Sequence, residues 1–202
     1  MNQTAQTAHP IHPLLSRRWS PHAFADRPVE STKLIALLEA ARWAPSSSNR
    51  QPWHFIVAEK QDRAEFNRLL DCLKPGNQSW AGQAPVLMLG VARQIDEGGS
   101  TNRHAFYDVG QAVAHMTIQA LDQGLYMRQM GGFDVAKAQR DFAIPQDFEP
   151  TAAIALGYPA AAGDLTEELR QKEQAPRARK PLVDFVFAGQ WGQTASLVAS
   201  ET

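Results

Sequence analysis

The chain has 202 residues, of which 44% are hydrophobic and 20% are charged, as in an ordinary globular protein of one domain. Its 20 Lys and Arg residues against 21 Asp and Glu residues give a formal net charge of −1, which excludes a general electrostatic grip on nucleic acid or on an acidic membrane surface. The single cysteine, Cys72, excludes an internal disulfide framework and a cysteine-rich zinc site.

The N-terminal part of the chain is polar. Residues 1–13 contain no apolar segment of the signal-peptide type and are expected to form a mobile arm. The longest clean apolar run, residues 84–92, is far shorter than the roughly 20 residues that a membrane-spanning helix needs. These features favour a soluble cytoplasmic protein that binds neither a membrane nor nucleic acid.

Apolar periodicity predicts the elements of the first half of the chain. A short helix is expected at residues 11–18, and a second helix begins with Ser31 or Thr32 as its N-cap and ends before Pro45. The apolar residues of this second helix recur at i, i+3, i+4 and i+7: Leu34, Leu37, Leu38 and Ala41. Residues 53–59 and 85–92 predict two buried strands, with a helix over residues 62–72 between them.

The second half of the chain predicts two more helices and a third strand before a charged helix. A long helix closes at a glycine cap, Gly124, and Gly110 within it is expected to allow a close backbone approach. One face of this helix carries Phe106, Val109, Gly110, Val113, Thr117, Ala120 and Leu121. A helix from Asp134 to near Phe142 and a strand over residues 151–156 follow. The charged helix starts with a capping box formed by Asp164 and Glu167.

The predicted elements favour one fold class. Only three strands stand among many helices, and none of them is followed by a Gly-rich phosphate loop, so an α+β sheet covered by helices is favoured over a Rossmann or P-loop fold. The end of the chain is first basic and then apolar, with the apolar part at Phe185, Val186, Phe187 and Trp191. Because the core is complete without them, we expect these side chains to pack on a partner subunit.

Two familiar kinds of catalytic site find little support. His9 and His12 have a spacing seen in metal ligands, but they lie in the predicted arm beside prolines and lack a suitably spaced carboxylate. Cys72 has no histidine near it in the sequence, and no GxSxG motif is present. We therefore expect no metal site and no catalytic side chain.

Three other segments carry groups that suit a ligand. Residues 45–53 (PSSSNRQPW) place hydroxyls and two amides just before a strand, and amides that donate and accept suit a heteroaromatic ring. Arg17 and Arg18 with Ser20, and the basic residues 177–180, would clamp a phosphate if they converged. The pair at residues 131–132 would expose backbone N–H groups. Their ordinary interpretations are a polar turn, a solvated charged surface and a flexible turn.

Together these segments resemble the nitroreductase family of FMN-dependent oxidoreductases. The resemblance extends from about residue 14 to residue 191. It is carried by residues 18–24 (RWSPHAF), 44–55 (APSSSNRQPWHF), 77–92 (NQSWAGQAPVLMLGVA), 131–134 (GGFD) and 155–159 (ALGYP). It implies an α+β fold with a central, mostly antiparallel sheet flanked by helices, in an intertwined homodimer with two FMN molecules at its interface. One FMN-binding domain would span residues 14–192, and residues 193–202 would form a C-terminal tail.

The resemblance also assigns binding roles to particular residues. Arg18, Trp19 and Ser20 would hold the phosphate and ribityl end of FMN, and Arg177 and Arg179 would complete the phosphate site. The other subunit would line the flavin ring with Pro45, Ser46, Ser47 and Asn49, and Gln51 would lie nearby. Asn77 would reach the polar edge of the ring, and Gly131 and Gly132 would offer backbone donors near flavin O4 and N5.

One position departs from the family pattern. The family usually has Arg or Lys where this chain has His22, and a second family lysine aligns with Trp80. In the family, the cation at the position of His22 lies near flavin N1 and O2, where the reduced flavin gathers negative charge. The resemblance thus predicts that protonation of His22, or other donors, stabilises the reduced flavin, and that the reduction potential depends on pH more strongly than in lysine-bearing relatives.

The function implied by the resemblance is electron transfer from NADH or NADPH, through flavin N5, to a nitroaromatic, a quinone or a similar small acceptor by a ping-pong mechanism. Trp80 and Phe106 would shape the acceptor pocket. Three alternatives remain open. They are another flavin reaction on the same fold (enal or semialdehyde reduction, dehalogenation or flavin fragmentation), a non-catalytic FMN-binding protein, and a helical interaction protein without a cofactor.

Overall fold

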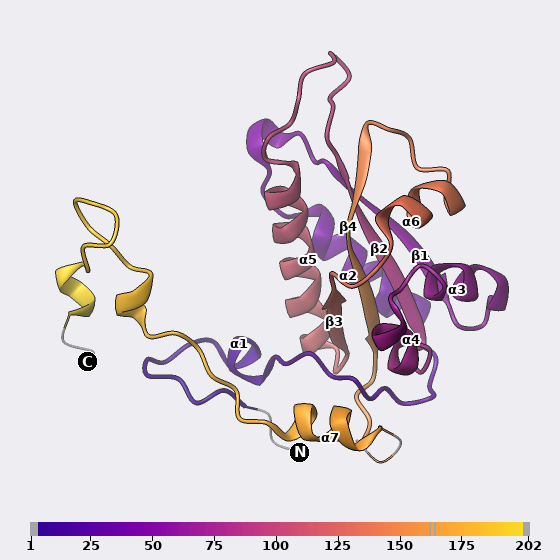
Figure 1. Cartoon of the computed structure of the whole chain (residues 1–202), viewed down its shortest axis with the longest axis horizontal. Coiled ribbons are helices and arrows are strands. Elements are labelled where there is room, and N and C mark those ends of the chain that lie inside the picture. The colour runs from indigo at the N-terminus through magenta and orange to yellow at the C-terminus, as the bar shows by residue number, and fades with distance from the viewer. Residues whose placement is uncertain (1–3, 162, 164, 200–202) are drawn as a thin grey trace.

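The structure is a computed structural model that describes residues 4–161, 163 and 165–199. Within these residues, four strands form one antiparallel sheet with the order β1-β2-β4-β3 (Figure 1). The strands are β1 (Trp53–Glu59), β2 (Val86–Arg93), β3 (Tyr126–Met130) and β4 (Phe148–Gly157). The expected α+β class and antiparallel sheet are therefore confirmed.

Helices cover both faces of the sheet. They are α1 (Pro13–Arg17), α2 (Ser31–Arg42), α3 (Arg63–Leu70), α4 (Pro75–Ala81), α5 (Ala105–Asp122), α6 (Val135–Asp141) and α7 (Glu167–Gln174). Successive β2 side chains alternate between two cores, because strand side chains point to opposite faces with a period of two. Leu87 and Leu89 pack with α3, α4 and α6, whereas Val86 and Met88 pack with α2 and α5.

Two short elements escaped the sequence-based prediction. The strand β3 (YMRQM) lies at the edge of the sheet, where it pairs only with β4 and carries polar residues that mask the alternation of a strand. The helix α4 starts with Pro-Gly-Asn, a composition typical of a turn. Both elements carry residues of the candidate site described below, so the missed elements matter for function.

The predicted helix ends were partly wrong. Glu30, without a side-chain capping bond, is the N-cap of α2, and Ser31 is already helical. Thr166 caps α7 by accepting a hydrogen bond from the backbone N–H of Leu169, whereas Asp164 lies outside the described residues. Gly124 follows the C-cap residue of α5, Gln123, and ends this helix as predicted, with a φ of +75°.

The buried face of α5 is also shifted from the predicted one. Val109, Val113 and Thr117 are buried as expected, but the Phe106 side chain is 46% exposed. Gly110 faces open space, with no heavy atom within 4 Å of the position that a Cβ would take. Within this one chain, the close approach expected at Gly110 is therefore not seen.

The C-terminal segment leaves the body of the molecule. After α7 the chain passes α1, and its last described residues lie far from the sheet (Figure 1). Its large apolar side chains are exposed, with Trp191 94%, Leu197 77% and Phe185 56% accessible to solvent.

None of the helices among the described residues is long and apolar enough to cross a membrane.

Candidate functional site

The two basic clusters at opposite ends of the chain converge on one pocket. The pocket has a volume of about 350 Å³. Arg18 Nη1 donates a hydrogen bond to Ser20 Oγ at 3.1 Å, and Arg177 Nη1 donates to the Ser16 carbonyl at 3.3 Å. The pocket is lined by Arg18, Trp19, Ser20, His22, Arg128, Lys172, Glu173, Ala175, Arg177 and Arg179. The five residues predicted for the phosphate and ribityl end are therefore brought together with His22, whereas Arg17 and Lys180 of the same basic clusters are not among the lining residues.

The guanidinium groups in this pocket repel one another. Burial lowers the pKa of Arg18, and the positive charges of Arg177 and Arg179 lower it further. Burial and the charge of Arg179 likewise lower the pKa of Arg177. Crowded like charges are costly unless an anion lies between them, so this arrangement suits a phosphate, which arginine binds through paired hydrogen bonds. We call residues Arg18, Ser20, Arg177 and Arg179 the arginine pocket.

Glu173 holds the two halves of the arginine pocket together. Its Oε1 accepts a hydrogen bond from Trp19 Nε1 at 3.1 Å, and its Oε2 accepts one from the His22 backbone N–H at 3.1 Å and lies 2.9 Å from His22 Nδ1. Because Arg18 precedes Trp19 and Arg177 follows Glu173, these bonds bring the two arginine-bearing segments together. Sequence reasoning missed Glu173, since its helix (EELRQKEQ) has the charge pattern of a solvated surface.

The Glu173 carboxylate is held in its charged form. Its side chain is only 6% exposed. Burial alone would raise the pKa of Glu173, but the hydrogen bonds from His22 and Trp19 outweigh burial and leave the pKa below its usual range. A buried carboxylate is tolerated only when it is paired and hydrogen-bonded, as it is here.

Arg128, on the missed strand β3, is a further cation of this pocket. It donates a hydrogen bond to the Ser20 carbonyl, and its guanidinium lies over the Trp80 ring, 5.3 Å from the ring centroid. At the start of the same strand, Tyr126 packs against Trp19 with ring centroids 4.1 Å apart. The edge strand thus forms one wall of the pocket.

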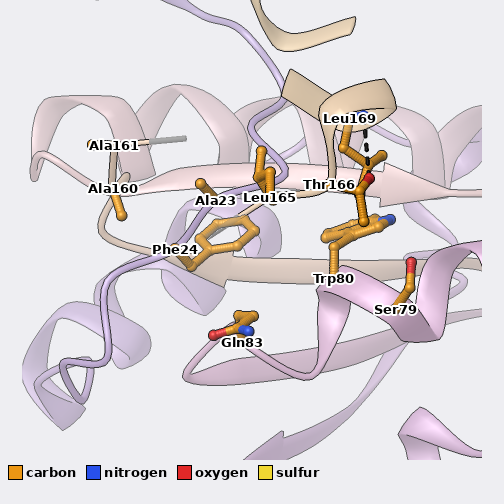
Figure 2. A pocket seen from close by; sticks show the side chains of 10 residues that line it. All are labelled: Ala23, Phe24, Ser79, Trp80, Gln83, Ala160, Ala161, Leu165, Thr166 and Leu169. Carbon is orange, nitrogen blue, oxygen red and sulfur yellow. Dashed lines mark hydrogen bonds between the residues drawn. The ribbon is translucent and has the colours of Figure 1, made fainter. Parts of the chain in front are cut away.

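Trp80 is a buried residue rather than part of an open surface. Its side chain is 2% exposed, and the His22 ring meets it edge-on at 5.2 Å. Figure 2 shows Trp80 of α4 facing Leu165, Thr166 and Leu169 across a small cavity of about 50 Å³. Phe106 lies at the beginning of α5 and is not among the residues that line this cavity. The structure therefore does not bring the two aromatic residues expected to shape an acceptor pocket together within one chain.

Asn77 and the glycine pair meet beyond the end of β3. Asn77 Nδ2 donates to the Gly132 carbonyl at 3.0 Å, and the Lys74 backbone N–H donates to the same oxygen at 2.9 Å. A Cβ on Gly132 would come within 2.6 Å of Asn77 Nδ2, whereas a Cβ on Gly131 would meet nothing within 4 Å. Residue 132 is thus closely packed, and residue 131 borders open space.

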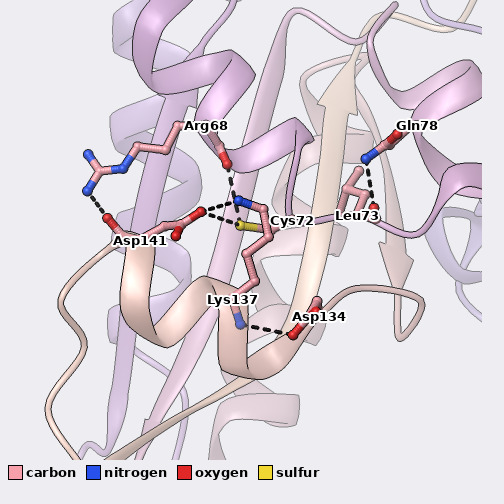
Figure 3. A network of polar contacts seen from close by, with 7 residues as sticks. All are labelled: Arg68, Cys72, Leu73, Gln78, Asp134, Lys137 and Asp141. Carbon is pink, nitrogen blue, oxygen red and sulfur yellow. Dashed lines mark hydrogen bonds and ion pairs between the residues drawn. The ribbon is translucent and has the colours of Figure 1, made fainter.

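A polar network anchors this glycine segment to the core (Figure 3). The Asp134 backbone N–H donates to the Cys72 carbonyl at 2.8 Å, and Asp134 Oδ1 caps α6 by accepting from the Lys137 N–H at 2.9 Å. Gln78 Nε2 donates to the Leu73 carbonyl at 2.9 Å, which orients α4. The Cys72 side chain is 2% exposed, and burial raises the pKa of its thiol, so Cys72 is suited to packing and not to nucleophilic attack.

The hydroxyl-and-amide loop, residues 45–51, is tightly folded. The Ser47 backbone N–H donates to Oδ2 of the buried Asp108 at 3.1 Å, and the Gln51 N–H donates to Ser46 Oγ at 3.0 Å. Three non-glycine residues of the loop have left-handed φ angles: Ser48 (53°), Asn49 (54°) and Gln51 (48°). Such angles cost free energy and are typical of functional loops whose surroundings enforce them.

This loop and the arginine pocket lie at opposite ends of α5 (Figure 1). The loop is bound to Asp108 in the first turn of the helix, whereas the arginine pocket adjoins β3, which follows the last turn. A helix of 18 residues is about 27 Å long. A single chain therefore does not bring the loop to the pocket.

Comparisons with known proteins agree with one another. The model of the nitroreductase family matches residues 15–73 and 61–158. An uncharacterised protein of Mycolicibacterium smegmatis is 37% identical over 63% of this chain and 84% of its own length. A protein of Streptomyces coelicolor, provisionally named NADH dehydrogenase/NAD(P)H nitroreductase, is 27% identical over 69% of this chain and 78% of its own length.

Solved structures give the same result. A crystal structure described as an oxidoreductase containing FMN superimposes with a TM-score of 0.88 at 34% identity, covering 94% of this chain and 97% of that one. A nitroreductase family protein from Clostridium difficile superimposes with a TM-score of 0.68 at 26% identity, covering 88% of this chain and 96% of that one.

Proposed function

The chain belongs to the nitroreductase family, and from this premise we propose that it is an oxidoreductase that carries FMN and takes electrons from NADH or NADPH. The observation that carries the proposal is the convergence of Arg18, Ser20, Arg177 and Arg179 on one pocket that Arg128 of β3 also lines, with the contact between Asn77 of α4 and Gly132 just beyond the end of that strand. The similar crystal structure that contains FMN supports the choice of cofactor.

The residues present fit FMN at both of its ends. The crowded guanidinium groups favour a dianionic phosphate, and Ser20 Oγ adds a hydroxyl that can donate or accept. At the other end, Asn77 supplies an amide and Gly131 leaves its backbone accessible where a side chain would otherwise stand. A flat heteroaromatic ring with donors and acceptors along its edge matches such a lining.

The protein contributes binding and orientation to the reaction. FMN, when bound, supplies the chemistry of accepting a hydride from a nicotinamide and of passing electrons to an acceptor. Arg18, Arg177 and Arg179 fix the phosphate, which sets the position of the whole ligand. Glu173 positions this end by holding Trp19 and His22, and the Gly132–Asn77 contact fixes the amide at the other end.

We further propose that the working unit is a homodimer. The hydroxyl-and-amide loop lies too far from the arginine pocket of its own chain, so a second copy would supply it. The exposed apolar tail, with Phe185, Trp191 and Leu197, gives the surface by which two copies would hold each other. Apolar patches of this kind on an extended segment mark a protein–protein contact.

The donor and the acceptor would use the same open face in turn, which predicts ping-pong kinetics. Nitroaromatics and quinones are the proposed acceptors, because flat electron-poor rings stack well on an aromatic surface. A cytoplasmic location is part of the same proposal and agrees with a single buried thiol.

Anaerobic stopped-flow spectroscopy tests the proposal. The protein reconstituted with FMN is mixed with NADH or with NADPH, and the flavin absorbance is followed before a panel of nitroaromatics and quinones is added. We expect rapid bleaching by at least one nicotinamide and recovery of the absorbance with the acceptor. A flavin that stays oxidised would indicate a binding protein without catalysis, and a protein that does not retain FMN would refute the proposal.

A further inference from the structure

The pocket holds more positive charge than a phosphate requires. Five cationic side chains line it, including Lys172, which is largely exposed and paired with Glu168. Arg18, Arg177 and Arg179 form one group, because the charges of the latter two lower the pKa of Arg18. Arg128 stands apart from this group. Burial lowers its pKa as well, but the charge that acts on it is the carboxylate of Glu173.

The position of Arg128 links the arginine pocket to the amide and glycine end. Its guanidinium lies over Trp80, which is three residues after Asn77 on α4. Residues at i and i+3 are neighbours on a helix surface, with Cβ atoms about 5–6 Å apart. On β3, Arg128 also shares a sheet face with Met130, directly before the glycine pair. A ligand that spans from Arg18 to Asn77 would therefore pass Arg128 midway.

Elementary redox chemistry gives a cation at that place a role. A hydride carries two electrons and one proton, so its transfer to a neutral ring leaves that ring with one additional negative charge. Arginine stays protonated throughout the physiological range, so its charge is available whenever the ring is reduced. His22 is less suited to this role, because its Nδ1 is in direct contact with the Glu173 carboxylate, 2.9 Å from Oε2, whereas the Arg128 guanidinium donates to the neutral Ser20 carbonyl.

We propose that Arg128 stabilises the reduced form of the bound flavin, whereas Arg18, Arg177 and Arg179 serve its phosphate. This inference rests on the proposed function. It assigns to a residue of the edge strand the electrostatic role that the family resemblance suggested for position 22. Trp80 and the Ser20 carbonyl hold the guanidinium in place, so Arg128 offers a fixed charge rather than a mobile one.

The test separates the ring from the phosphate by comparing FMN with riboflavin, which lacks the phosphate. Both ligands are titrated into wild type, Arg128→Gln and Arg179→Gln, in the oxidised state and after anaerobic reduction with dithionite. For Arg128→Gln we expect the affinity for the reduced form to fall about tenfold more than the affinity for the oxidised form, with both ligands. That ratio corresponds to a midpoint potential lower by about 30 mV.

The control has the opposite pattern. Arg179→Gln should weaken FMN equally in both redox states, leave riboflavin affinity unchanged and leave the midpoint potential unchanged. If Arg128→Gln behaves in this way instead, Arg128 is a fourth phosphate ligand and the inference is overturned. Arg128→Lys keeps the charge, so it should retain a potential close to that of wild type even if Arg128→Gln folds poorly.

The pH dependence of the potential separates Arg128 from His22. With a permanent cation, the wild-type potential between pH 6 and 8 should follow the slope of free flavin. A steeper slope that His22→Gln removes would assign the role to His22 and overturn the inference. If wild type binds neither FMN nor riboflavin, the proposed function itself is refuted. If wild type binds both, and Arg128→Gln lowers the affinity for the oxidised and the reduced form of each ligand equally, only the role of Arg128 is refuted.

Discussion

The arginine pocket and the hydroxyl-and-amide loop are two halves of one proposed site, and the chain builds them in different ways. The arginine pocket is assembled inside one chain from distant segments, through buried contacts such as the Glu173–His22 pair. The loop is local in sequence, exposed, and held in left-handed conformations by Asp108 and Ser46.

This difference shows that the two halves contribute different kinds of chemical group to binding. The buried half supplies charge, whose effect is strong in a low-dielectric surrounding and which must be compensated when no ligand is bound. The exposed half supplies neutral hydroxyls and amides, which are hydrated when no ligand is bound and therefore need no compensating charge. Each chain would form the charged half by itself, and the partner subunit would supply the neutral half. The complete site would therefore exist only in the assembled dimer.

Removal of the C-terminal segment should have the largest effect. A chain that ends after Pro181 keeps the arginine pocket but loses the exposed side chains of Phe185 and Trp191. We expect a monomer in analytical ultracentrifugation that no longer retains FMN through gel filtration, although circular dichroism remains that of a folded protein. A truncated chain that is dimeric, or that binds FMN as wild type does, would show that the tail does not join two copies.

Mixed dimers offer the sharpest test of a site shared between chains. Arg18→Gln damages the pocket, and Asn49→Gly removes an amide from the loop without straining its positive φ. At an FMN concentration where neither homodimer binds, a heterodimer has one site with both defects and one intact site. We expect one FMN per heterodimer by fluorescence titration. No recovery would mean that the loop and the pocket act within the same chain.

Glu173→Gln should weaken the buried half in a pH-dependent way. The pKa of Glu173 is lowered in the folded protein, so its stabilising effect is complete above the ordinary glutamate pKa of about 4.3 and is lost as the pH falls below that value. Near pH 7 we expect the variant to lose about 1.5–3 kcal/mol in the free energy of unfolding, as for a hydrogen bond to a charged group.

Urea denaturation between pH 3 and pH 7 measures this effect. The difference between wild type and Glu173→Gln should shrink as the pH falls, because the wild-type carboxyl becomes protonated. Glu168→Gln, on the exposed side of the same helix, is the matched control and should change little over this range. A difference that stays constant with pH would mean that Glu173 contributes through packing and not through its charge.

Much of this site was predictable from the sequence, and what was missed has a common cause. Arg18 and the pair at 131–132 stand in segments with unusual composition, so pattern alone singled them out, whereas Asn77 was assigned through the family resemblance. Arg128 and Glu173 did not stand out, because each is a charged residue in a short polar element. Their roles depend on burial, which comes from contacts distant in sequence. Asp108 was missed for the same reason, since a polar residue in the first turn of a helix is ordinary.

The smallest expected effect distinguishes the two glycines at the end of β3. In Gly132→Ala, the new Cβ would come within 2.6 Å of Asn77 Nδ2, so the amide must move away from the Gly132 carbonyl that it contacts. Since this atom is the end of a flexible side chain, we expect only a several-fold loss of FMN affinity and a small loss of stability. In Gly131→Ala the Cβ meets nothing within 4 Å, so the chain itself tolerates it, and any loss of affinity would come from contact of the new methyl group with bound FMN.

Isothermal titration with FMN, alongside thermal unfolding of both ligand-free variants, separates these causes. Gly132→Ala should lower both the melting temperature and the affinity, whereas Gly131→Ala should lower the affinity alone; equal melting temperatures for both variants would mean that the Asn77–Gly132 contact does not order this end of the site.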